Sequence, residues 1–254
     1  MFAPAHLRTA RRDRTILAGS LIAMAVVAWL ALWAWESSPY GHYLHHDGGG
    51  GGSVAVGALA FTAGWVLMIV AMMLPSSVPL VMTFAALVGR RQRPGRLVGL
   101  LLLGYLLVWA GFGLAAWAAD LGIHALVDVI PLLAAHPGLV LAATLLGAGL
   151  WQFSPWRDRC LDECRSPLGF VMNRWRGNSE RREALLMGVA HGAFCVGCCW
   201  SLMLVMFGIG ISSLPAMLAL GGLTAIEKNL PQGRRLTRPL GVVLVLAALY
   251  AVAG

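Results

Sequence analysis

The chain has 254 residues, of which 59% are hydrophobic and only 12% are charged, with 19 basic against 11 acidic side chains. This charged fraction is about half that of a soluble domain and excludes a soluble globular protein. The net charge of +8 then reflects which loops lie on which side of a membrane, and a nucleic-acid partner is not needed to explain it. We therefore expect an all-α transmembrane helical bundle, with residues 1–254 forming a single integral membrane domain.

Apolar segments predict about seven membrane spans. A helix needs roughly 20 mainly apolar residues to cross the hydrocarbon core, and the first such segment follows an arginine-rich tail, residues 1–15. No small-x-small cleavage site follows this segment, so we interpret it as an uncleaved span and not as a signal peptide. Six to seven spans are expected in all, with candidates at residues 16–35, 54–88, 97–119, 139–153, 184–211, 214–226 and 240–253.

Breaks are predicted inside and between these spans. Pro75 and Pro79 should break or kink the second span, since each removes a backbone donor. The connection at residues 36–53 is polar and contains five consecutive glycines, which indicates a flexible external loop. Residues 121–136 are too short and interrupted to cross, so we expect a separate external helix lying on the membrane.

The basic residues predict the orientation. All of them lie in the N-terminal tail or in connections at residues 89–96, 154–183 and 227–239, whereas the alternate connections contain none. Because Lys and Arg near helix ends are retained on the cytoplasmic side, we expect the N-terminus inside and the C-terminus outside. Residues 154–183 would then form a cytoplasmic loop that contains cysteines.

The sequence HGAFCVGCCW, residues 191–200, places several metal-binding side chains within an apolar run. Met187, His191, Cys195 and Cys198 follow at helical spacings, so all four share one face of a helix, with Cys199 on its flank. Soft sulfur ligands with an imidazole suit Cu(I) best and zinc second. The alternative is that the cysteines are simply buried as small hydrophobic residues. The cost of polar groups in hydrocarbon favours a metal or redox role.

Neighbouring helices are expected to complete this site. Gly188, Gly192 and Gly197 are small enough to let adjacent helices approach closely. Met72 and Met73, just before the prolines of the second span, are plausible transient thioether ligands for Cu(I). Their alternative role is packing, because methionine commonly fills gaps between apolar helices.

A second cysteine pair lies in SPWRDRCLDECRSP. Ser154 can cap a helix whose first residue is a proline, and Cys160 and Cys164 then lie one turn apart on its face, at the cytoplasmic surface. Nearby arginines, among them Arg157 and Arg165, would favour the thiolate form that binds metal or attacks disulfides. The competing interpretation is an amphipathic interfacial helix with incidental cysteines.

With these motifs in view, the chain resembles a bacterial family of predicted metal-binding integral membrane proteins, formerly a domain of unknown function. Some members of that family are regarded as membrane copper chaperones that help to load copper oxidases such as tyrosinase. The resemblance implies copper handling in the bacterial cytoplasmic (inner) membrane. At Trp151 and Arg157 the chain departs from the family pattern, which carries a tyrosine and a lysine there. The matching segments are AMMLPSSVP at 71–79, residues 151–170, residues 187–203 and the Glu-Lys pair at 227–228.

The leading hypothesis is a non-enzymatic membrane protein that binds Cu(I), with zinc as a second possibility, and serves a cuproenzyme client or a metal donor protein. A membrane thiol–disulfide oxidoreductase, a vectorial metal transporter and an accessory subunit remain as alternatives. The oligomeric state stays open, and no hydrolase or nucleotide-binding motif is present. The predicted intramembrane ligands are His191, Cys195, Cys198, Cys199, Met187, Met72 and Met73, and the predicted cytoplasmic relay is Cys160 and Cys164.

Overall fold

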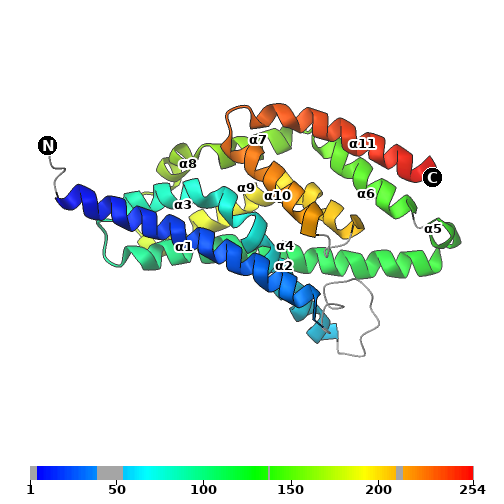
Figure 1. Cartoon of the computed structure of the whole chain (residues 1–254), viewed down its shortest axis with the longest axis horizontal. Helices are drawn as coiled ribbons and strands as arrows, with labels where there is room; N and C mark the ends of the chain where they lie inside the picture. The colour runs from blue at the N-terminus through cyan, green and yellow to red at the C-terminus, as the bar shows by residue number, and fades with distance from the viewer. Residues whose placement is uncertain (1–4, 39–53, 137, 210–213, 254) are drawn as a thin grey trace.

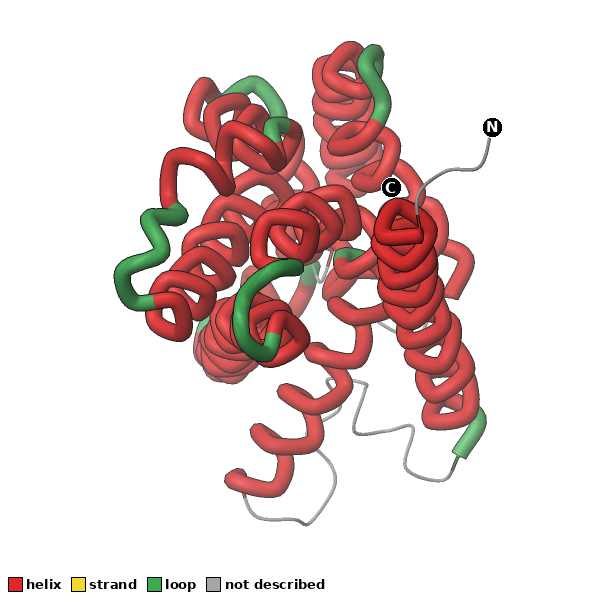
Figure 2. Tube along the Cα trace, turned by 90° about the vertical axis from the view of Figure 1, so that its left-hand side faces the viewer, coloured by secondary structure: helices red, strands yellow, loops and turns green. Residues whose placement is uncertain are grey.

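The computed structural model describes residues 5–38, 54–136, 138–209 and 214–253 (Figure 1). Within these residues all regular structure is helical and no strand occurs (Figure 2), which confirms the all-α helical bundle. The elements are α1 (Ala5–Glu36), α2 (Val54–Met72), α3 (Leu74–Val88), α4 (Pro94–Val129), α5 (Pro131–Ala135), α6 (Gly138–Trp151), α7 (Pro155–Arg165), α8 (Pro167–Arg174), α9 (Glu180–Ile209), α10 (Leu214–Asn229), the 3-10 helix η2 (Gly233–Leu236) and α11 (Thr237–Ala253).

Five of the described helical segments are long and apolar enough to cross a membrane, in α1, α2, α4, α9 and the η2–α11 segment. A sixth span results if α6 and α7, which are bent by 66° relative to each other, are counted as one broken span. The sequence-based estimate was six to seven. The difference arises because α6 has 14 residues and α10 has 16, both short of the roughly 20 that a crossing helix needs.

The two ends of the first span differ in how much the structure describes. α1 begins at Ala5, so most of the predicted tail at residues 1–15 is the first part of this helix. Only residues 36–38 of the predicted external loop are described, so its expected flexibility lies outside the described residues. The connection between the candidate spans at 184–211 and 214–226 also lies outside them.

The predicted proline break is confirmed between α2 and α3. α2 ends at Met72 and α3 begins at Leu74, with Pro75 in the first turn of α3. A proline fits the first turn of a helix because the amide hydrogen it lacks would have no intrahelical acceptor there. The chain changes direction at this point (Figure 1), which leaves Met73 at the corner between the two helices.

The helix expected at residues 121–136 is not separate, and this prediction is wrong. α4 continues without a break from Pro94 to Val129. No proline interrupts it, and its exposed last part contains an Asp120–His124 pair at 3.4 Å. The helix ends where Pro131 forces Ile130 into an extended conformation, with φ −102° and ψ 104°.

Glycines set the spacing between α9 and its two main neighbours. A Cβ at Gly104 of α4, or at Gly188 of α9, would collide with the backbone of the facing helix. A Cβ at Gly192 would lie 2.9 Å from a side-chain carbon of α4, and one at Gly197 would lie 2.6 Å from the sulfur of Cys160 on α7. The expected close approach is therefore present, and it brings α4 and α7 onto α9.

The basic segments gather toward one end of the bundle. The first turns of α1, the α3–α4 connection and α8 lie on the left in Figure 1, whereas α5 and the C-terminus lie on the right. The sides of the outer helices are apolar, as at Val27, Leu30 and Trp33 of α1, which are 62%, 59% and 61% exposed. This distribution is compatible with a membrane protein, since a soluble monomer rarely exposes so large an apolar surface.

Candidate metal centre

The predicted stripe of α9 faces the interior of the bundle. Met187, His191, Cys195, Cys198 and Cys199 are all buried, and none of them exceeds 3% exposure. The side chains therefore do not point toward lipid, although a membrane helix with ordinary packing would carry apolar residues at these positions.

Cys195 has two polar neighbours, each from a different helix. The ammonium group of Lys228 on α10 donates a hydrogen bond to its sulfur, with Nζ and Sγ 3.0 Å apart. The hydroxyl of Tyr105 on α4 lies 3.4 Å from the same sulfur. The sulfur of Cys195 therefore lies between a basic side chain and a phenol hydroxyl.

The other two cysteines of α9 link Cys195 to further sulfur atoms. The thiols of Cys198 and Cys199 donate to the backbone oxygen of Cys195, at 3.1 and 2.9 Å. Cys199 also lies 3.9 Å from the sulfur of Met73, and Cys198 contacts the thiol of Cys164 on α7. We call these five side chains the sulfur centre: Met73, Cys164, Cys195, Cys198 and Cys199.

The predicted helix that carries Cys160 and Cys164 is confirmed as α7. Ser154 accepts a hydrogen bond from the amide of Trp156 at 3.3 Å, and Pro155 is the first residue of the helix. α7 lies against α9, with Cys160 beside Gly197. Both cysteines of α7 are only partly buried, and all five cysteines of the chain are free thiols. The pair therefore connects the buried sulfur atoms with the exterior of the bundle.

Two of the arginines expected to activate these thiols face α10 instead. Arg157 is fully buried, and its guanidinium donates to Glu227 at 2.7 Å and to Thr237 at 3.0 Å. Arg165 donates to the backbone oxygens of Glu227 and Leu230. The positive charge closest to the sulfur atoms is that of Lys228.

The remaining predicted ligands lie around the sulfur centre and have other contacts. The Nε2 atom of His191 lies 3.1 Å from the hydroxyl oxygen of Ser77, and its ring stacks on Tyr105 with centroids 5.5 Å apart. The buried Nδ1 atom of His191 has no hydrogen-bond partner. Met72 packs against Gly221 of α10.

Within the described part of the chain, no three His, Cys, Asp or Glu side chains are arranged to hold one metal ion. A structural zinc site uses four such ligands and a catalytic one uses three. Thiolate and thioether sulfurs together are the donors that select Cu(I). The sulfur centre contains donors of this soft kind, four thiols and one thioether.

Sequence reasoning about ligands missed three residues that shape this centre: Lys228, Tyr105 and Ser76. Ser76 donates to the backbone oxygen of Met73 at 2.8 Å, and its own oxygen lies 3.5 Å from the ammonium of Lys228. The sequence sets Lys228 apart in one respect, because it is the sole lysine among the 19 basic residues. Tyr105 carries no comparable signal in the sequence.

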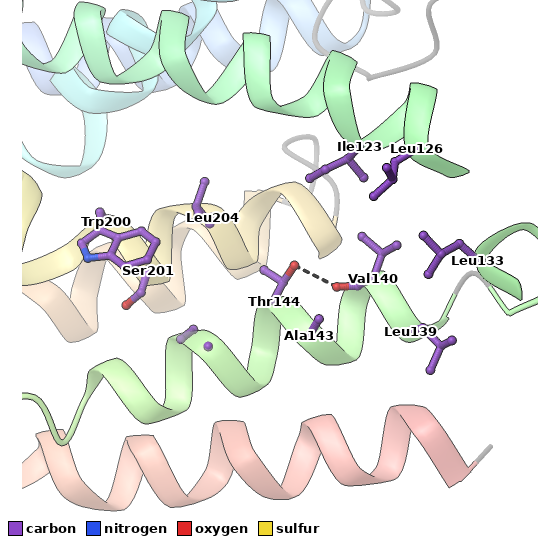
Figure 3. Close-up of a pocket in the computed structure, with 12 residues that line it drawn as sticks. Ile123, Leu126, Leu133, Leu139, Val140, Ala143, Thr144, Trp200, Ser201 and Leu204 are labelled. Carbon is purple, nitrogen blue, oxygen red and sulfur yellow. Dashed lines mark hydrogen bonds between the residues drawn. The ribbon is translucent and has the colours of Figure 1, made fainter. Parts of the chain in front are cut away.

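A separate cavity of about 430 Å³ lies between the ends of α4, α6 and α9 (Figure 3). Its lining is almost entirely apolar, with Ile123, Leu126 and Leu204 among the side chains. The hydroxyl of Thr144 donates to the backbone oxygen of Val140 at 2.9 Å. The cavity contains none of the predicted ligands and no ionisable side chain, so it is distinct from the sulfur centre.

Comparison with known proteins identifies one family. The model of the family PpoB2, described as a copper chaperone, matches residues 62–251, well over half of the chain. No curated protein and no solved structure matches the chain. The matched region contains every residue of the sulfur centre, and the chain belongs to this copper chaperone family.

Proposed function

We propose that this member of the copper chaperone family binds Cu(I) as its cargo at the sulfur centre and passes it to a cuproenzyme client. The observation that supports this most directly is the contact between Cys164 on the partly exposed α7 and Cys198 on the buried α9. It joins thiols near the exterior to thiols in the interior. Cu(I) prefers such sulfur donors and binds them as thiolates.

The order of the thiols defines a route for the ion. Cys160 and Cys164 form the outer part, Cys198 is the first buried ligand, and Cys195 with Cys199 and Met73 forms the inner part. Each step replaces one sulfur ligand by the next, so Cu(I) moves without becoming a free ion. His191, one turn from Cys195, is an additional candidate ligand through its unpartnered Nδ1 atom.

We place the protein in the bacterial cytoplasmic membrane, with its N-terminus inside. The apolar helices and the gathering of basic segments at one end of the bundle support this orientation. The α7 cysteines would then receive or deliver copper on the cytoplasmic side of the sulfur centre.

Metal analysis of the purified protein tests the proposal. We expect the wild-type chain to retain Cu(I) under reducing conditions in detergent and the Cys195→Ser, Cys198→Ser double variant to lose it. Met203→Leu is the matched control, because Met203 is also fully buried on α9. Equal copper content in the wild-type protein and the double variant would overturn the proposed site.

A kinetic experiment tests the role of α7. The Cys160→Ser, Cys164→Ser variant should take up Cu(I) from a soluble chelator more slowly than the wild type, by about 10-fold or more, because the outer ligands are gone. Its final copper content should be close to that of the wild type, since the α9 thiols remain. Unchanged uptake would remove α7 from the route. Trapped mixed disulfides without bound copper would favour a thiol–disulfide oxidoreductase.

A further inference from the structure

Three methionines outside the sulfur centre are buried deep in the bundle. Met68 on α2, Met206 on α9 and Met217 on α10 are each no more than 1% exposed. They come from three different helices and belong to the same packed core as Met73 and the cysteines of α9. The contacts at the sulfur centre fix how these three helices are aligned, and therefore where the three thioethers lie.

The helix register places Met206 opposite Met217. α9 and α10 lie side by side, and only four residues separate the end of α9 from the start of α10, so the two helices are antiparallel (Figure 1). Met206 follows Cys195 by 11 residues, and Met217 precedes Lys228 by 11 residues. Eleven residues are about three turns, which return each side chain to within about 20° of the same face. Since Cys195 and Lys228 are 3.0 Å apart, the two thioethers lie at one level, about 17 Å along the bundle.

α2 approaches the sulfur centre from the same side as α10. Tyr105 of α4 contacts Cys195 at the centre. Eight residues farther along α4, an added Cβ at Gly113 would collide with the ring of Trp65 on α2. Trp65 precedes Met73, a member of the centre, by the same eight residues. Since α4 runs alongside α9 in the same direction, α2 lies antiparallel to both and parallel to α10.

This alignment brings Met68 to the level of Met217. A Cβ at Gly221 of α10 would lie 3.4 Å from three carbon atoms of Met72 on α2. Met68 precedes Met72 by four residues, and Met217 precedes Gly221 by four. Each methionine therefore lies one turn earlier on the same face of its helix. Three buried thioethers from α2, α9 and α10 thus gather at one level, toward the C-terminal end of α9.

We propose that Met68, Met206 and Met217 form a second soft-metal site, the thioether site, which takes a monovalent ion such as Cu(I) or Ag⁺. Thioether sulfur is a soft ligand that selects Cu(I). It is also neutral, so a buried ion there keeps its charge and is held less tightly than by thiolates. Purification then removes this ion, and retained copper reports the sulfur centre alone.

The thioether site extends the route beyond the sulfur centre. α7 contacts α9 at Cys198, and Met206 lies eight residues farther toward the C-terminal end of α9. A loosely binding site after a tightly binding one lets the ion leave on the side away from Cys164. This direction rests on the proposed function, since it takes Cu(I) at the sulfur centre to be the cargo.

NMR of the methionine methyl groups in the purified full-length protein tests the inference. Each of the 11 methionines gives one signal, assigned by replacing one methionine at a time with leucine, and Ag⁺ is the probe. Once the sulfur centre is filled, further Ag⁺ should shift the signals of Met68, Met206 and Met217 together, with an affinity at least about 10-fold weaker than that of the centre. Met24 on α1 and Met82 on α3 should keep their signals, because these helices contribute nothing to the site.

A double variant separates the two sites. Met206→Leu, Met217→Leu replaces both thioethers by apolar side chains of similar size, and it should weaken the second class of Ag⁺ binding by about 10-fold or more. Its copper content at the sulfur centre should equal that of the wild type, and Met82→Leu should change neither quantity. Tryptophan fluorescence on heating shows whether each variant is folded.

The outcomes distinguish this inference from the proposed function. Retained copper in the wild type, with no shift by Ag⁺ at the three methionines, would overturn the thioether site and leave the proposed function intact. An unchanged second class of Ag⁺ binding in the folded double variant would also overturn it, with the methionines serving only to pack the helices. Shifts at all three methionines in a protein that retains no copper would support the thioether site and overturn the sulfur centre as the cargo site.

Discussion

Two adjacent residues at the end of α10 bury opposite charges in two different settings. Glu227 is held by Arg157 at 2.7 Å and by the hydroxyl of Thr237 at 3.1 Å. Lys228 points instead to the sulfur of Cys195. Successive residues of a helix point about 100° apart, so α10 sends one charge toward α7 and α11 and the other toward the sulfur centre. The first charge has a matched ionic partner, whereas the second has partners that also suit a metal ion.

The ion pair of Arg157 and Glu227 also positions the cysteine helix of the proposed metal route. It ties α7, α10 and the start of α11 together through Arg157, Glu227 and Thr237. Since α7 carries Cys164, this network keeps that thiol against Cys198. A buried charge with a matched ionic partner, such as Arg157 with Glu227, belongs to the architecture of the bundle. A buried charge facing polarisable sulfur, as Lys228 does, belongs to the proposed binding site.

The largest effect is expected when the ion pair between Arg157 and Glu227 is broken. Arg157→Ala leaves Glu227 buried without its ionic partner, which should lower the free energy of unfolding by about 3–5 kcal/mol. Lys228→Met should cost less, about 1 kcal/mol, because it replaces a buried ammonium by an unbranched apolar side chain of similar size. Denaturant unfolding in detergent measures the free energy of unfolding of both variants. Equal decreases would show that the two buried charges contribute alike to stability.

A glycine substitution on α9 tests the sulfur centre separately, because it leaves the Arg157–Glu227 ion pair intact. Gly188→Ala places a methyl group against the backbone of α4 at Leu101 and Tyr105, which should destabilise the protein by about 1–3 kcal/mol and lower its copper content. Gly111→Ala on α4 is the control, because no atom lies near its added methyl group. If the two variants match in stability and copper content, the close contact between α4 and α9 does not support the site.

Removing the cap of α7 should have a smaller effect. Ser154→Ala deletes the hydrogen bond to the amide of Trp156 and should cost about 1 kcal/mol. The first turn of α7 would open more often, so Cys160 should react faster with a thiol reagent while the buried Cys195 keeps its wild-type rate. Parallel acceleration at both cysteines would indicate global unfolding, which would contradict a local role for the cap.

The smallest effect is expected at an exposed ionic group. Arg234 bonds to Asp158 at 3.3 Å and to Asp162 at 3.0 Å, with its side chain 51% exposed. Arg234→Ala should change the free energy of unfolding by less than about 1 kcal/mol, and high salt should remove the difference. A loss as large as that of Arg157→Ala would show that burial does not separate the two arginines.

Local rules predicted much of this molecule. The cap at Ser154, the prolines that begin α3 and α7 and the interior stripe of α9 are all present in the structure. Each depends on contacts within a few residues or on one helical period, so sequence contains the necessary information. The third candidate span ends at residue 119, whereas α4 continues to Val129, because no proline interrupts it before Pro131.

The sequence by itself determined that the chain is helical and apolar, that proline interrupts the second span, and that histidine and cysteines share one face of α9. The tertiary structure alone decided that Lys228 faces Cys195, that Arg157 faces Glu227 and that Met73 lies beside Cys199. The physical reason is that a side chain's partner depends on the rotation and separation of whole helices. These are fixed here by backbone contacts at glycines such as Gly188, which no local pattern encodes.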